Sequence, residues 1–295
     1  MNILENISAF QNLIYIAASI LFITGIKMLG KEDTAVKGNF LSALAMLIAV
    51  VITFLDPDVQ VNPYLILAGI GVGATVGSLI ALKVKMTSIP EMVALFNGFG
   101  GLATFFIAWS EFNSVPDNTF QYVLIMLTTY IGGVTFSGSI VAYGKLSEKL
   151  KIQKTSIITK FFTTIFYVSI IYLIYSILIA NIFIPPFDFF IVLLALTLLG
   201  GIGFVIPIGG GDMPVVISLL NSFSGIAAAF AGLLLLNNVL IVAGSLVGAS
   251  GLILTVIMAK AMNRSIGNIL FVGYASSPSG SKSEETGEVK PINVS

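Results

Sequence analysis

The string GGGDMP at residues 209–214, with the polar run that follows it, stands out from an otherwise apolar sequence. Asp212 brings a carboxylate. An amide and three hydroxyl groups follow, at Ser218, Asn221, Ser222 and Ser224. Such groups cost several kcal/mol in hydrocarbon unless they find partners. We therefore interpret the segment as part of a pathway or a coupling site rather than as a folding element.

Polar residues recur at helical spacing on three predicted helix faces. These faces are Asn97, Gly101 and Thr104; Thr128, Gly132, Thr135 and Ser139; and Ser218, Asn221 or Ser222, and Gly225. At 1.5 Å per residue, Asn97, Ser139 and Asn221 lie about 9–14 Å from the nearer helix ends, close to the middle of a ~30 Å hydrocarbon core. They either join helices, at ~0.6 kcal/mol for an average bond, or line a thread of water. Because three faces converge at one depth, we favour a polar path.

Two carboxylates, Glu91 and Asp212, lie at the starts of two predicted helices that are led by proline. A negative charge there meets the positive end of the helix dipole, worth about 0.3–1 kcal/mol, so both residues are suited to capping. They are equally placed to face a cytoplasmic partner or to gate proton exchange. For Asp212, within a run of glycines, we favour the functional role. For Glu91 both interpretations stay open.

The two proline-led segments resemble each other. Residues 90–103 (PEMVALFNGFGGLA) align without gaps to residues 214–227 (PVVISLLNSFSGIA), with six identities. The next helices share Gly-Ser followed by Ile or Leu and Val, at 138–141 and 244–247. Both segments start from the same side and lie four spans apart, so we interpret them as a parallel repeat.

A membrane bundle is needed to position these groups. The chain of 295 residues is 57% hydrophobic and 9% charged, whereas a soluble domain carries about 25% charged residues. Nine apolar spans are each long enough to cross the hydrocarbon core. They cover residues 10–29, 38–55, 64–82, 89–109, 121–143, 161–184, 187–207, 214–236 and 238–259. The predicted fold class is an all-α polytopic membrane protein with about nine transmembrane helices.

Small residues at intervals of four predict close helix packing in two of these spans. They are Gly69, Gly73, Gly77 and Ala81 in the third span, and Gly244, Gly248, Gly251 and Thr255 in the ninth.

Basic residues fall on only one side of the predicted topology. All 14 Lys and Arg residues follow odd-numbered spans, and the other side carries acidic residues alone. The positive-inside rule then places the N-terminus outside and the C-terminus in the cytoplasm.

The absence of cysteine and histidine limits the disulfide, metal-binding and proton-transfer chemistry available to the chain. Without cysteine the chain has no disulfide and no thiolate metal site, and without histidine it lacks the usual proton carrier near neutral pH. The glycine runs at 200–203 and 209–211 lack Gly-x-Gly-x-x-Gly spacing and a preceding soluble strand. We therefore expect no cofactor, metal or nucleic acid to be bound by this chain.

The chain divides into a transmembrane domain, residues 1–268, and a flexible cytoplasmic linker, residues 269–295. The tail from Ala275 onward is rich in Ser, Gly, Glu and Lys, with too little apolar surface to fold alone. It is interpreted either as a linker toward a missing cytoplasmic domain or as an ordinary disordered C-terminus.

Four strings carry a family resemblance over essentially the whole chain. They are VALFNGFGG (93–101), GVTFSGSIVAYGKL (133–146), GGDMPVVISLLNSFSG (210–225) and KAMNRS (260–265). They resemble the membrane part of the beta subunit of proton-translocating NAD(P) transhydrogenase. The resemblance implies hydride transfer from NADH to NADP⁺, driven by inward proton movement across the cytoplasmic (inner) membrane. It implies NAD(H) on a domain of the alpha subunit and NADP(H) on a cytoplasmic domain that follows the beta membrane region. An alpha subunit with its own membrane helices, and a homodimer of the complex, are the expected partners.

The resemblance also assigns roles to residues. Asn97 takes the position at which some members hold a proton-handling histidine, and Ser139 and Asn221 belong to the same proposed proton route. Asp212 and residues 260–265 face the NADP domain and relay the coupling. The expected proton-pathway set is Asn97, Thr135, Ser139, Ser218, Asn221 and Ser222, and the expected coupling set is Glu91, Asp212, Lys260, Asn263 and Arg264.

The absence of histidine departs from this pattern. Amides and hydroxyls hold no net proton near pH 7, so they order water and the titrating group comes from a partner. The chain contributes to an enzyme but is not expected to catalyse hydride transfer alone, and no catalytic residue is assigned to it.

Two alternatives belong to other classes. One is a secondary transporter that binds a small solute between parallel helix repeats, against which the lack of a buried charge counts. The other is a purely structural membrane anchor, for which apolar substitutions at Thr135 and Ser139 are harmless.

Overall fold

The computed structural model describes residues 3–55, 62–114, 116, 118–150, 157–180 and 186–270. Ten α-helices and two 3-10 turns, Met86–Ser88 and Gly210–Asp212, form this part of the chain, and it contains no strand. The helices are α1 (Ile3–Leu29), α2 (Glu32–Phe54), α3 (Pro63–Lys83), α4 (Ile89–Asn113), α5 (Thr119–Leu146), α6 (Ile157–Ala180), α7 (Phe187–Val205), α8 (Met213–Leu234), α9 (Asn238–Ala261) and α10 (Ile266–Leu270). Among the described residues, nine helices are long and apolar enough to cross a membrane, which confirms the predicted fold class. The sidedness of the two termini stays a prediction.

Some helices start earlier than the apolar spans. Helix α2 begins at Glu32, where the predicted span began at residue 38, because its acidic first turn with Asp33 is favoured by the helix dipole. Helix α6 begins at Ile157 instead of residue 161. At the far end, α10 extends across the predicted boundary at residue 268, and Ile269 is buried against the bundle. Residues 271–295 of the predicted linker lie outside the described residues.

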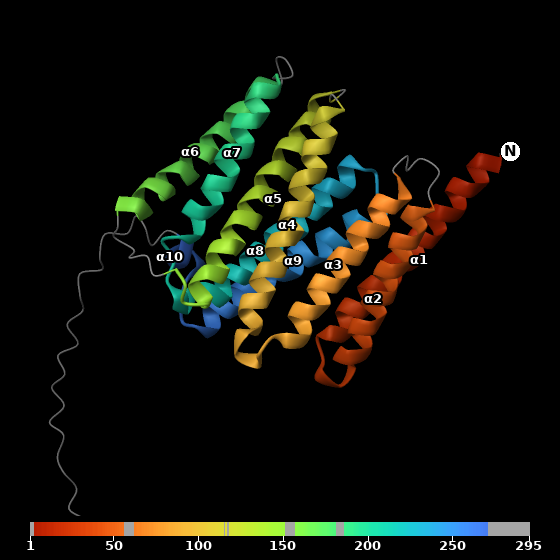
Figure 1. Ribbon diagram of the computed structural model, residues 1–295, viewed down its shortest axis with the longest axis horizontal. Helices are drawn as coiled ribbons and strands as arrows, with labels where there is room; N and C mark the ends of the chain where they lie inside the picture. The colour runs from red at the N-terminus through yellow and green to blue at the C-terminus, as the bar shows by residue number, and fades with distance from the viewer. Residues whose placement is uncertain are drawn as a thin grey trace, which may run out of the picture.

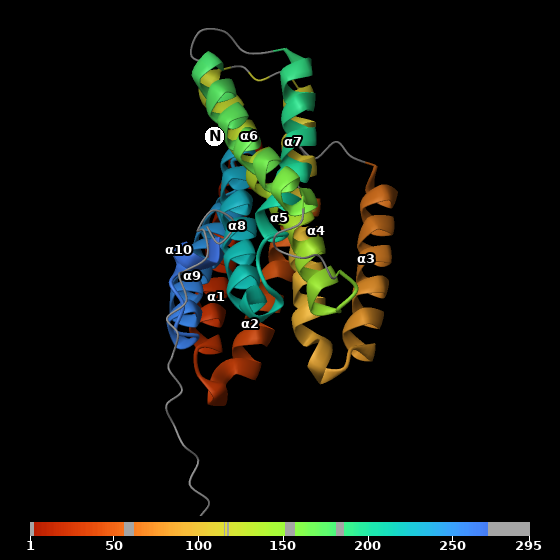
Figure 2. The ribbon, with the colours of Figure 1, turned by 90° about the vertical axis from the view of Figure 1, so that its left-hand side faces the viewer.

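Helix α5 lies at the centre of the bundle, with α4, α7 and α8 packed around it (Figures 1 and 2). Successive helices pair as hairpins: α1 with α2, α4 with α5, α6 with α7, and α8 with α9. In α5, 16 of 28 residues are buried, whereas α3 buries none. Polar groups on α5 therefore need partners inside the protein, while α3 keeps an uncovered face.

Within each of two hairpins, α4–α5 and α8–α9, glycines bring the two helix backbones into contact. A Cβ atom on Gly101 of α4 would lie 2.8 Å from the carbonyl oxygen of Gly132 in α5. A Cβ atom on Gly225 of α8 would lie 2.9 Å from the carbonyl oxygen of Gly244 in α9. Gly101 and Gly225 are equivalent positions of the sequence repeat, so both halves of the repeat use the same close approach.

The helices α4 and α8 also begin alike. Each follows a 3-10 turn and carries a proline, Pro90 or Pro214, at the start of its first turn. Their N-cap residues share one backbone conformation, with φ −100° and ψ 8° at Ser88 and φ −91° and ψ 0° at Asp212. The missing proline N–H is no loss there, since the first N–H groups of a helix have no intrahelical acceptor.

Of three apolar clusters among the described residues, the two larger ones hold the centre of the bundle together. One fixes α4, α5 and α7 and includes Phe112 stacked on Phe190, with ring centroids 4.1 Å apart. The other surrounds the connection from α7 to α8 and includes Ile208, Met213 and Ile269. The second cluster anchors the start of α8, which carries most of the polar run.

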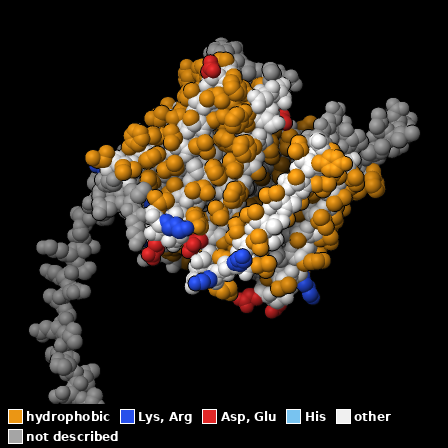
Figure 3. Space-filling model, in the orientation of Figure 1, with side chains coloured by type: hydrophobic (Ala, Val, Ile, Leu, Met, Phe, Trp, Pro, Cys, Tyr) orange, Lys and Arg blue, Asp and Glu red, His pale blue; other side chains and the backbone are white. Residues whose placement is uncertain are grey.

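Helices α1, α3, α5, α7 and α9 finish at the same end of the molecule, which we call the basic end. Figure 3 shows most of its visible Lys and Arg side chains along the lower edge. At this end α9 stops in a tight turn: Asn263 adopts φ 52°, and the N–H of Arg264 donates to the carbonyl of Ala259. Asparagine tolerates this left-handed conformation better than most residues, so the turn projects Arg264 from a defined position.

Candidate functional site

The side chain of Asn97 joins three helices. It lies eight residues after the first residue of α4, about 12 Å along the axis. Its Nδ2 donates to Ser139 Oγ of α5 at 3.0 Å, and its Oδ1 accepts from Ser224 Oγ of α8 at 2.7 Å. We call Asn97, Ser139, Asn221 and Ser224 the Asn97 cluster.

Hydrogen bonds within the Asn97 cluster have a direction. An amide nitrogen only donates, so Ser139 Oγ must accept, and its own hydrogen remains for another acceptor. Ser224 Oγ lies 2.7 Å from Asn97 Oδ1 and 2.8 Å from the Asn221 carbonyl oxygen, so two acceptors compete for one hydrogen. When the Ser224 hydroxyl donates to Asn97, the donors run in one direction, from Ser224 through Asn97 to Ser139. A row of polar groups with one polarity is suited to relaying hydrogen bonds between helices.

Asn221 occupies in α8 the place that Asn97 occupies in α4. It also lies eight residues after the first residue of its helix, about 12 Å along the axis. The side chain is half-buried, and its amide makes no hydrogen bond to another described residue. The structure thus brings Asn97, Ser139 and Asn221 to one level, as the spacing predicts, but leaves one amide with spare donors and acceptors.

Thr135 continues the cluster away from the basic end. It precedes Ser139 by one turn of α5, is fully buried, and faces Gly101 of α4. Its hydroxyl has no hydrogen-bond partner in the described protein. A buried hydroxyl without a partner costs about 1–3 kcal/mol, which a bound water would relieve.

Ser218 and Ser222 both point to α9. Ser222 Oγ donates to the Gly248 carbonyl at 2.6 Å, and Ser218 Oγ to the Gly251 carbonyl at 3.3 Å. Both acceptors belong to α9. A helix turns by about 100° per residue, so Asn221 and Ser222 cannot share a face. Ser218, Ser222 and Gly225 therefore share the face toward α9, as the alternative with Ser222 predicts, and the Asn221 side chain makes no hydrogen bond to another described residue. A pathway role for the two serines stays a prediction.

Asp212 and Arg264 meet at the basic end. Arg264 Nε lies 3.8 Å from Asp212 Oδ1, and the aspartate side chain is 14% exposed. Asp212 is the N-cap of α8, but its side chain makes no capping hydrogen bond. Its interaction is thus with the turn after α9 rather than with its own helix. Lys260 and Asn263 are exposed in or beside the same turn.

Glu91 lies apart from this pair, in the first turn of α4. It is half-buried in the wall of a cavity of about 440 Å³ whose lining also includes Lys83 of α3 and Tyr143 of α5. Among the described residues, no group of three or more acidic side chains is arranged as it would be around a metal ion.

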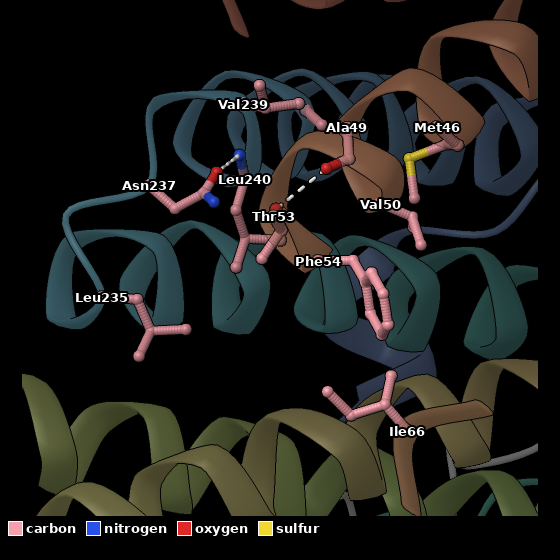
Figure 4. A pocket seen from close by; sticks show the side chains of 11 residues that line it. Met46, Ala49, Val50, Thr53, Phe54, Ile66, Leu235, Asn237, Val239 and Leu240 are labelled. Carbon is pink, nitrogen blue, oxygen red and sulfur yellow. Dashed lines mark hydrogen bonds between the residues drawn. The ribbon is translucent and has the colours of Figure 1, made fainter. Parts of the chain in front are cut away.

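A second cavity, of about 320 Å³, lies at the opposite end of α3. Figure 4 shows its wall, formed by Met46 and Phe54 of α2, Ile66 of α3 and Leu240 of α9. Its two polar residues already have partners: Thr53 Oγ1 donates to the Ala49 carbonyl and lies 2.9 Å from the Tyr15 hydroxyl of α1, and Asn237 Oδ1 caps α9. The wall is therefore apolar. In Figure 3 the surface is hollowed between α3 and α4.

The glycine face of α3 lines no helix contact. A Cβ atom on Gly69, Gly73 or Gly77 would meet nothing within 4 Å. Close packing is realised by the glycines of α9, and the same expectation for α3 is not met within the described chain.

Two residues were left out of the predicted site: Ser224, which was named only as part of the polar run, and Lys145. Ser224 lies one turn after Asn221, and its i, i+3 spacing was a usable signal. Lys145 follows the polar face of α5, and its Nζ lies within hydrogen-bond distance of carbonyl oxygens at the end of α7. Nothing in the sequence indicates that contact.

The fold and the site together define a multi-pass helical membrane protein with a hydrogen-bonded polar cluster at its centre. The chain belongs to the NAD(P) transhydrogenase beta subunit family, whose model matches residues 11–295. It is 38% identical over 271 residues to the NAD(P) transhydrogenase subunit beta of Rhodospirillum rubrum, covering 89% of this chain and 58% of that protein. A second sequence of the same name, from a defined strain of that species, matches equally. The chain thus spans somewhat under two thirds of the length of these relatives.

Proposed function

We propose that this chain forms the membrane part of a proton-translocating NAD(P) transhydrogenase, and that the Asn97 cluster lies on its proton route. The observation that carries the proposal is the amide of Asn97, which bridges Ser139 and Ser224 at about the middle of the bundle. Membership of the beta subunit family supports this function over the transport of a small solute.

Within this route the chain's own residues orient hydrogen bonds. Neither amides nor hydroxyls take up a net proton near pH 7. The Asn97 cluster therefore positions water molecules and a partner's titrating group next to each other by hydrogen bonds. Thr135, with its unpaired buried hydroxyl, extends the route toward the end opposite the basic one.

We infer that the titrating group arrives on a membrane helix of an alpha subunit, seated in the groove between α3 and α4. The two cavities lie at the two ends of α3, and α3 buries none of its residues. The wall of the groove is apolar and small along α3, which suits a transmembrane helix. On α4, Phe96 and Phe99 are 37% and 54% exposed on one face of the helix, and Asn97 is half-buried. A helix seated there would reach the cluster.

Hydride transfer from NADH to NADP⁺ then takes place outside the membrane part. We propose that the basic end faces the cytoplasm, and that Asp212, Lys260, Asn263 and Arg264 face an NADP-binding domain. Glu91 would face the same side. NAD(H) would be held by the alpha subunit, and residues 269–295 would lead toward the NADP domain. The complete enzyme is proposed as a homodimer in the cytoplasmic membrane.

Proton uptake by sealed liposomes tests the proposal. The liposomes carry this chain assembled with the alpha-type membrane partner and the NADP domain. Uptake is started with NADPH and NAD⁺ added outside, because hydride transfer in that direction moves protons from the nucleotide side into the lumen. Asn97→Leu and Asn221→Leu should each lower uptake by about tenfold or more, because the hydrogen-bonded route is interrupted.

Ser250→Ala is the matched control, since Ser250 is exposed on α9. It should behave as the unchanged protein. Normal uptake in Asn97→Leu would remove the Asn97 cluster from the route.

A further inference from the structure

The ammonium group of Lys145 holds the end of another helix. Lys145 lies one residue before the end of α5 and is half-buried. Its Nζ donates to the carbonyl oxygens of Val205, Ile206 and Ile208, at 3.2, 2.5 and 2.5 Å. These three residues close α7 and begin the connection to α8.

This contact supplies hydrogen-bond donors to carbonyl oxygens that have no donor within α7. The last carbonyls of a helix have no intrahelical donor, and the helix C-terminus carries a partial negative charge. Val205, Ile206 and Ile208 are at most 3% exposed, so water has little access to them. An ammonium has three hydrogens in a compact group and matches three converging carbonyls. An apolar side chain at 145 would leave buried carbonyls without a donor.

Lys145 also stands between two parts of the candidate site. Ser139 of the Asn97 cluster precedes it by six residues on α5, about 9 Å along the axis. In the other direction, Ile208 is followed after four residues by Asp212, which pairs with Arg264. One rigid helix and one ammonium thus connect the amide in the membrane to the carboxylate at the basic end.

We propose that Lys145 is a positioning residue that couples α5 to the Asp212 loop, residues 206–212. It keeps the loop fixed relative to the Asn97 cluster, so that a change at the cluster moves Asp212 and a change at Asp212 moves α5. The proposal rests on the proposed function for what is coupled. The clamp itself is a property of this chain alone.

Lys149 provides a matched control one turn further along. Its Nζ is exposed, 3.4 Å from the Tyr143 hydroxyl and 5.4 Å from the centre of that ring. Lys149→Met removes a cation from the same end of the molecule without touching the end of α7. Lys145→Met removes the clamp with a side chain of similar length.

The first measurement follows the loop directly. The chain has no cysteine, so Gly211→Cys introduces a single labelling position. Space around Gly211 is open, with no atom within 4 Å of an added Cβ. A spin label there, in the complete complex, should become several-fold more mobile in Lys145→Met and stay unchanged in Lys149→Met. An unchanged label in Lys145→Met would overturn the clamp.

The second measurement compares proton uptake with hydride transfer in the same sealed liposomes, without the label. Lys145→Met should lower the protons moved per hydride by about fivefold or more, the lower range of allosteric coupling. Lys145→Arg should recover most of the ratio, because its guanidinium donates to the same carbonyls. Lys149→Met should keep it.

A merely structural lysine would lower assembly or total activity and leave the ratio of protons to hydride unchanged. That result, with a mobile loop, would overturn the coupling role. If Lys145→Met fails to assemble, Lys145→Gln, which keeps two donors but no charge, is judged by the same two readouts. If the unchanged complex moves no protons, the proposed function fails, and the label still decides whether Lys145 holds the loop.

Discussion

At the scale of single residues, the site is built from neutral polar groups whose partners are other helices. Asn97 uses both ends of its amide, while Asn221 at the equivalent position keeps its amide unpaired among the described residues. The two halves of the sequence repeat therefore differ in their hydrogen bonds: Asn97 joins three helices, whereas Asn221 keeps an amide that could bind water or a partner in the proposed route. Thr135 shares that unpaired state in a fully buried place.

The substitution Thr135→Val distinguishes between two possibilities: a site in which the hydroxyl binds a water of the proton route, and a site that is dry. If a water of the proton route binds the hydroxyl, Thr135→Val should slow nucleotide-driven proton uptake and leave the melting temperature unchanged or lower. In a dry site the same change removes an unpaired polar group worth about 1–3 kcal/mol and raises the melting temperature. We expect the first outcome, measured by liposome uptake and thermal unfolding.

Thr128→Val serves as the comparison, because the hydroxyl of Thr128 already donates to the Leu124 carbonyl. A stabilised Thr135→Val protein with normal proton uptake would exclude Thr135 from the route.

At the scale of helices, α8 carries two functions on two faces. One face, with Ser222 and Gly225, is locked to α9 through backbone contacts and short hydrogen bonds. The other face presents Ser224 to Asn97 of α4. The lock fixes the rotation of α8 about its own axis, and that rotation decides which polar side chains reach the Asn97 cluster.

Filling the glycine contact between α8 and α9 should be costly. In Gly225→Val the new side chain meets the backbone of Gly244 and Gly248, which cannot move aside as a flexible side chain would. Overpacking of this kind costs about 1–3 kcal/mol, so the chain purified in detergent should melt several degrees lower.

Gly100→Val makes the same chemical change on α4, where an added Cβ meets nothing within 4 Å. Equal melting temperatures for the two variants would contradict the packing argument.

At the scale of the whole molecule, the bundle is compact around α5 and open along α3. Cavities of about 320 and 440 Å³ lie at the two ends of α3, and the glycines between them contact nothing. A transmembrane helix with an uncovered small-residue face is suited to pack against another helix.

A bulky residue on α3 should therefore block assembly without unfolding the chain. Gly73→Phe should abolish copurification of the alpha subunit and leave the melting temperature of the separate chain unchanged, since nothing within 4 Å opposes the new side chain. Ile171→Phe on α6, a position 66% exposed, should keep normal assembly. Full copurification with Gly73→Phe would place the partner elsewhere.

Much of this architecture is determined by local sequence. Apolar spans of membrane length, prolines at helix starts and asparagine caps act over a few residues, so the nine helices and the depth of Asn97, Ser139 and Asn221 follow from composition and spacing. The similarity of 90–103 to 214–227 likewise predicts two helices that begin alike. Because the rise per residue is constant along a helix, the level of a side chain can be counted without knowing its neighbours.

Tertiary structure alone decided which way each side chain faces. Rotation of α8 is set by its glycine contact with α9, which turns Ser218 and Ser222 toward α9 and brings Ser224 to Asn97. The bond from Lys145 to the end of α7 joins residues about 60 positions apart. Such contacts depend on how close two helix backbones come and at what rotation. Those quantities belong to the packed bundle, because no single helix encodes the position of its neighbour.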